Sequence, residues 1–155
     1  MTSPFDINEE LEELAAWRRA NENPSLTLLD VLGFVATIDS VAAHLALFDP
    51  DLVVHRGARF LASGFSEETF DGWMSRGLTV TQAQQVMNHL HIASFLQSGA
   101  SDEACDWFAS RLAEVWRKTI PGAEVVVEGQ GYDDASVTFF EAGPRDRPSS
   151  RPPAM

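Results

Sequence analysis

The 155-residue sequence contains one cysteine, Cys105, and one lysine, Lys118. A single cysteine excludes an intramolecular disulfide, so the fold must be held by a hydrophobic core. A chain of this length suggests one domain, which buries roughly 70% of the surface that the unfolded chain exposes. The N-terminal residues lack the basic and apolar segments of a signal peptide. We therefore expect a cytoplasmic protein.

Positive charge is also scarce, because 11 Lys and Arg face 23 Asp and Glu, for a formal net charge of -12. A strongly acidic protein repels nucleic acid and anionic membranes, so neither is an expected partner. The charge suits a basic protein partner, although it also serves solubility. We expect residues 1–142 to form a single α+β domain and the Pro- and Arg-rich segment 143–155 to be disordered. Ten arginines against one lysine favour a GC-rich, bacterial genome.

The longest apolar run of the sequence spans residues 27–48. Its polar or small residues recur three or four positions apart, which places them on one narrow stripe of a helix: Asp30, Gly33, Thr37, Ser40 and His44. A helix that is apolar on nearly all sides is typically buried. The aspartates make a membrane span costly, by about 2.5–3.5 kcal/mol for a charge near the bilayer centre. The pattern therefore predicts one long central helix in a protein core.

The other segments predict helices and hairpins in an order that is typical of an α+β fold. We expect helices at 6–20, after Ser66 up to Gly77, at 82–97 and at 102–119, with capping residues at Asp6, Ser66, Thr81 and Ser101. Arg56-Gly57 suits a two-residue turn between strands 52–55 and 58–62. A second hairpin joins 125–127 to 136–140. The predicted fold is a small antiparallel sheet of two hairpins, about four strands, packed against about five helices.

His89 and His91 form the densest polar group in an apolar setting. On a strand the two imidazoles would share one face and could ligate one metal ion. On the predicted helix they point about 160° apart, so one ion cannot easily use both. The favoured interpretation is a pair hydrogen-bonded to backbone or carboxylate groups. We expect no metal and no cofactor.

A small enzyme or ligand-binding domain is one of two functional hypotheses. Its pocket would lie between the central helix and the sheet, with acid–base or metal chemistry from Asp39, His55, His89 and His91. The competing interpretation of the helix aspartates is that they face solvent or pair with arginines. Cys105 is not an expected nucleophile, because neighbouring acidic residues would raise the pKa of its thiol.

The favoured hypothesis is a small acidic interaction protein that neutralises or regulates a basic protein partner, as an immunity protein or antitoxin does. Gly129-Gln130-Gly131 follows a strand and leads to another strand, so it suits a hairpin loop better than a phosphate-binding loop. That loop would present an aromatic anchor ringed by acid. The candidate contact residues are Glu9, Glu12, Glu13, Tyr132, Asp133, Asp134 and Glu141.

Overall fold

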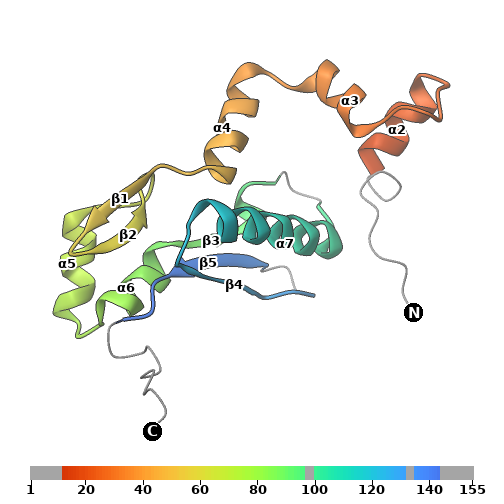
Figure 1. The fold of residues 1–155 in the computed structure, drawn as a ribbon. Helices are drawn as coiled ribbons and strands as arrows, with labels where there is room; N and C mark the ends of the chain where they lie inside the picture. The colour runs from red at the N-terminus through yellow and green to blue at the C-terminus, as the bar shows by residue number, and fades with distance from the viewer. Residues whose placement is uncertain (1–11, 97–99, 132–134, 144–155) are drawn as a thin grey trace, which may run out of the picture.

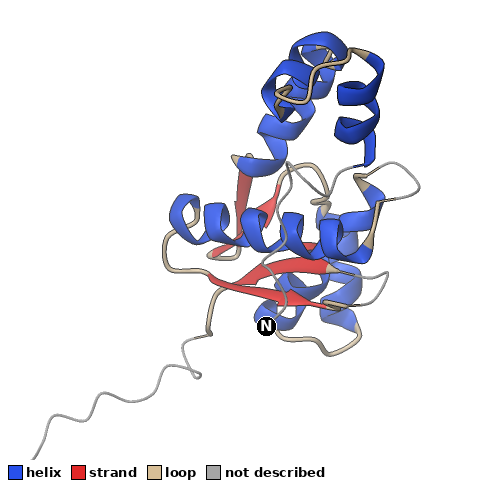
Figure 2. Cartoon of the chain, turned by 90° about the vertical axis from the view of Figure 1, so that its right-hand side faces the viewer, coloured by secondary structure: helices blue, strands red, loops and turns tan. Residues whose placement is uncertain are grey.

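The computed structural model describes residues 12–96, 100–131 and 135–143 (Figure 1). In chain order the elements are α2 (Glu12–Ala20), α3 (Leu28–Val35), α4 (Ile38–Phe48), β1 (Leu52–His55), β2 (Ala58–Leu61), α5 (Glu67–Ser75), α6 (Val80–Met87), β3 (His89–His91), the 3-10 helix η1 (Ile92–Ser94), α7 (Asp102–Thr119), β4 (Glu124–Glu128) and β5 (Ser136–Phe140). The predicted α+β class is confirmed. Helices α2, α3 and α4 extend away from the strands in both views (Figures 1 and 2). We call residues 12–48 the arm and the described residues from Leu52 onward the body.

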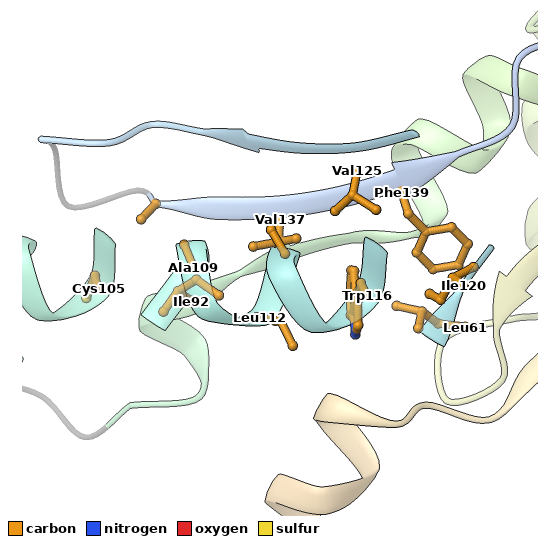
Figure 3. Close-up of a cluster of buried hydrophobic side chains, with 12 residues drawn as sticks. Leu61, Ile92, Cys105, Ala109, Leu112, Trp116, Ile120, Val125, Val137 and Phe139 are labelled. Atoms are coloured by element: carbon orange, nitrogen blue, oxygen red, sulfur yellow. The ribbon is translucent and has the colours of Figure 1, made fainter. Parts of the chain in front are cut away.

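The main core of the body lies between α7 and a three-stranded antiparallel sheet of order β3-β5-β4. Side chains alternate along a strand, so Val137 and Phe139 of β5 share the face that packs against α7 (Figure 3). Leu112 and Trp116 come from the facing side of α7, and both are fully buried. The Trp116 and Phe139 rings meet edge to face, with centroids 5.5 Å apart. Ser101 caps α7, and the helix spans the residues that the sequence predicts.

A second sheet contains only β1 and β2, joined by the predicted two-residue turn at Arg56-Gly57. Both turn residues have positive φ, 49° and 80°, which is the backbone conformation of the tight hairpin turn. Fully buried Phe60 of β2 packs edge to face against Phe70 of α5. The sequence therefore predicts this hairpin correctly. The expected single sheet of four strands is instead two sheets, of two and three strands.

The expected buried central helix is wrong in two respects. The segment forms two helices, α3 and α4, separated by an extended Ala36 with φ -75° and ψ 129°. The Thr37 side chain accepts a hydrogen bond from the Ser40 N–H, and the Ser40 hydroxyl oxygen accepts one from the Thr37 N–H. This reciprocal capping starts a new helix at Ile38. Within α3 and α4, which are described in full, Val31 alone is buried.

The expected helix over 82–97 is also wrong, because α6 ends at Met87 and His89–His91 forms strand β3. The capping box is Thr79 with Gln82, two residues before the expected one. Strand β3 pairs antiparallel with β5, and His89 lies opposite Thr138. Leu90 packs against the core on one face, while the histidines lie on the other.

Helix α6 joins the two sheets through a buried polar network. The Asn88 side-chain oxygen accepts from the Leu61 N–H at 3.0 Å, and its amide donates to the carbonyls of Arg59 and Phe139 at 3.1 and 3.2 Å. The Gln84 amide donates to the Arg59 carbonyl and to the Glu141 carboxylate, at 3.0 and 3.1 Å. Its oxygen accepts from the Glu141 N–H. The network satisfies polar groups of β2, β5 and α6 together.

We expect Gln84→Ala to lower the free energy of unfolding by about 2 kcal/mol, because it leaves buried polar groups of this network without partners. Gln85→Ala is the matched control, since Gln85 is the next residue of α6 and is exposed. The control should change stability by less than about 0.5 kcal/mol. Urea unfolding of both variants measures the difference, and equal stabilities would contradict the role given to the network.

Candidate interaction surface

The arm carries large apolar side chains that the described structure leaves exposed. Leu29, Phe34 and Ile38 are 78%, 72% and 80% exposed. We define the arm surface as these three residues together with Leu32, Val35 and Leu45, which are also exposed. Single exposed apolar residues are normal, whereas six on two consecutive helices make a candidate binding surface. The apolar run predicted burial, so these residues were not expected to be exposed.

The arm is attached to the body mainly through the last turn of α4. The indole N–H of Trp116 donates to the Leu47 carbonyl at 3.0 Å, and the Phe48 and Phe108 rings lie 5.5 Å apart. Nearer the N-terminus, α2 and α3 contact each other, with the Trp17 and Phe34 rings stacked at 5.6 Å. The arm is thus anchored at one end, and its outer length is held by its own contacts.

From the end of α2 to the end of β1, every Lys, Arg, Asp or Glu side chain is acidic. No Lys or Arg lies between Arg19 and Arg56, while the same interval contains Glu22, Asp30, Asp39, Asp49 and Asp51. Hydrogen bonds from the hydroxyl and then the backbone N–H of Thr27 hold the pKa of Asp30 below its ordinary value. Asp30 thus stays ionised near neutral pH. An apolar surface bordered by carboxylates favours a partner with apolar and cationic groups.

An apolar groove of about 310 Å³ lies on the body side of α4. Ala43, Leu47, Pro50, Leu90, Phe95 and Trp116 provide most of its lining, with His44 and Ser63 as polar neighbours. The sequence-based hypothesis of a pocket between the apolar run and the sheet concerns this part of the molecule. None of the four histidine or aspartate candidates lines the groove.

The four candidate acid–base residues lie on three separate elements. Asp39 is exposed in the first turn of α4. His55 ends β1, with its ring 5.3 and 4.8 Å from those of Phe65 and Phe70 and its Nδ1 3.9 Å from the Glu67 carboxylate. His89 and His91 lie on β3. The structure brings only the last two together.

The two histidines of β3 have ring centroids 4.6 Å apart. His89 Nδ1 is 2.7 Å from the Thr138 hydroxyl, which positions both groups on the sheet face opposite α7. A cleft of about 320 Å³ on this face is lined by His89, Thr138, Gln85, Val126, Glu128 and Phe140. Within the described ranges, no three His, Cys, Asp or Glu side chains are grouped so that they could hold a metal ion.

The predicted partner-binding residues are placed only in part. Glu9, Tyr132, Asp133 and Asp134 lie outside the described residues, and so do the side chains of Glu12 and Glu13 on α2. Before the loop tip, the Gly131 N–H donates to Asp106 at 2.9 Å. Glu141 is half-buried, and both of its oxygens accept hydrogen bonds from Arg59, at 2.6 and 3.1 Å. The Glu141 carboxylate binds Arg59 of β2 and Gln84 of α6, so it is not a free acidic contact.

Burial by itself would raise the pKa of Glu141, but hydrogen bonds from Arg59 and Gln84 outweigh it and hold the pKa below its ordinary value. A lowered pKa in the folded state adds stability above the ordinary pKa, and this stability is lost as the pH falls through the folded value. The free energy of unfolding should therefore fall more between about pH 6 and about pH 3 in the native protein than in Glu141→Gln.

Glu114→Gln is the control, because Glu114 forms an exposed ion pair with Arg111 and exposed pairs contribute little. Its pH profile of stability, measured by urea unfolding, should follow that of the native protein. A Glu141→Gln profile parallel to the native one would contradict the linkage.

No helix within residues 12–96, 100–131 and 135–143 is long and apolar enough to cross a membrane. No family model matches the chain. Comparison with curated proteins and with solved structures likewise gives no match.

Proposed function

We propose that this protein is a small acidic interaction protein that binds a basic protein partner through the arm surface. The single observation that carries the proposal is the exposure of Leu29, Phe34 and Ile38 on an arm whose neighbouring charges are negative. Such binding would neutralise or regulate the partner, as an immunity protein or antitoxin does.

The size of the arm surface supports stable association. Six large apolar side chains, exposed by 49% to 80%, offer on the order of 800 Å². This is about what one partner contributes to a protein–protein interface of standard size.

The charge of the arm favours a basic partner over a second copy of this chain. A symmetric contact between two arms would bring Asp30 and Asp39 of each copy towards a surface of the same sign. Like charges at an interface cost free energy, whereas a cationic partner gains attraction and a faster, salt-sensitive encounter. The expected partner therefore carries cationic groups next to an apolar surface.

The small enzyme or ligand-binding domain is the second candidate, and one observation favours it. The hydrogen bond between His89 and Thr138 lies beside a cleft that can admit a small molecule. Its other proposed participants, Asp39 and His55, are on α4 and β1 and do not line that cleft. The arm surface therefore supports the interaction function better.

Affinity capture with tagged baits tests the proposal. At low salt the native bait should retain a basic protein that the Leu29→Ser/Ile38→Ser bait loses, because serine removes the apolar contact. At about 0.5 M salt, where the Debye length falls to roughly 4 Å, retention by the native bait should also fall. Mass spectrometry of the eluates identifies the retained protein.

The control bait is Val54→Ser/Val86→Ser, which removes two exposed apolar side chains of the body, 70% and 46% exposed on β1 and α6. This bait should capture the same basic protein as the native one. If the arm variant and the control capture identical proteins, the arm surface is not the binding site.

A further inference from the structure

Helix α4 has apolar residues on both its outer side and its body side. At about 100° per residue, Ile38 and Leu45 point to one side, while Ala43 and Leu47 point to the opposite side. The first pair belongs to the arm surface and the second lines the groove. A partner that covers only the arm surface would leave the groove side of α4 open.

We propose that the groove receives a large apolar side chain of the basic partner, beside a Lys or Arg of that partner that Asp49 or Asp51 binds. The inference rests on the proposed function. It adds the place where the partner binds and the kind of side chain that binds there. The partner would then contact α4 on both its outer side and its body side. This would account for a helix that is apolar nearly all round but has no buried residue of its own.

The volume and lining of the groove fit one such side chain. A dry apolar cavity of about 150 Å³ holds benzene in another protein, so about 310 Å³ has room for an indole or a leucine side chain. The lining is mostly aliphatic and aromatic, which favours an apolar occupant. Interface residues that contribute most to affinity are typically large side chains seated in such pockets.

The floor of the groove is preformed. Trp116 is fully buried, and its hydrogen bond to the Leu47 carbonyl fixes α4 against α7 on this side. Leu61 of β2 also lines the groove and is held by the Asn88 side chain. A partner side chain therefore enters a site whose walls need little ordering, which reduces the entropic cost of binding.

Two carboxylates are sequence neighbours of the groove lining. Asp49 and Asp51 are exposed and flank Pro50, which lines the groove. His44 lines the groove, and its Nδ1–H donates to the Ser40 carbonyl at 2.6 Å. Acceptors next to an apolar site match a Lys or Arg that neighbours the anchoring side chain.

A labelled helical peptide of leucine, alanine and lysine tests the groove, with a second peptide in which glutamate replaces lysine. Fluorescence anisotropy should show that the lysine peptide binds at least about ten-fold more tightly than the glutamate peptide. Ala43→Trp fills the groove and should weaken binding of the lysine peptide by at least about ten-fold. Thr69→Trp, at an exposed position of α5, is the control and should leave binding unchanged.

Paired charge variants provide a second measurement, which does not require a larger side chain in the groove. Asp49→Asn/Asp51→Asn should weaken binding of the lysine peptide and reduce its salt dependence. Glu67→Gln/Glu68→Gln makes the same change of net charge on α5 and should do neither. Circular dichroism checks that all variants remain folded.

The outcomes separate this inference from the proposed function. If Leu29→Ser/Ile38→Ser weakens binding of the lysine peptide and Ala43→Trp does not, the groove is overturned and the arm surface stands. If Ala43→Trp alone weakens it, the groove stands and the arm surface fails. Equal binding of both peptides overturns a cationic partner. No binding of the lysine peptide overturns the groove, and a dimer in light scattering would then assign the arm to a second copy.

Discussion

The body depends on the hydrogen bonds that Gln84, Asn88 and Glu141 make around Arg59. The two sheets share no strand, so their relative position is set by α6 and by this network. Arg59 also donates to the Pro121 carbonyl at 2.8 Å, which ties the hairpin to the end of α7. Buried polar groups with all partners present fix a unique arrangement, whereas apolar packing alone tolerates several.

Sequence patterns predicted the elements whose signals are local. The Arg56-Gly57 turn, the Ser66 cap of α5 and the Ser101 cap of α7 each depend on two to four neighbouring residues, and all are confirmed. Strand β3 was missed because a three-residue strand is stabilised by its partner β5, which is 49 residues away at the His89–Thr138 pair. The alternation of His89, Leu90 and His91 was the signal available, and a helical interpretation of the surrounding residues outweighed it.

The candidate site shows the opposite weakness of sequence patterns. The apolar residues of α3 and α4 predict a surface that is buried against something. Helical periodicity does not say whether it is buried by the rest of the chain or by another molecule. The acidic contacts predicted from composition were equally ambiguous, since Glu141 forms part of the internal network. Placing the carboxylate required the long-range contact with Arg59, 82 residues away.

The two capping boxes of the arm limit which backbone torsions set the angle between α3 and α4. Thr27 with Asp30 closes the start of α3, and Thr37 with Ser40 closes the start of α4, so each helix has its own N-terminal stop. The Thr37 N–H and carbonyl are both held by α4, through Ser40 and Val41. The angle between α3 and α4 is therefore set by the two backbone torsions of Ala36.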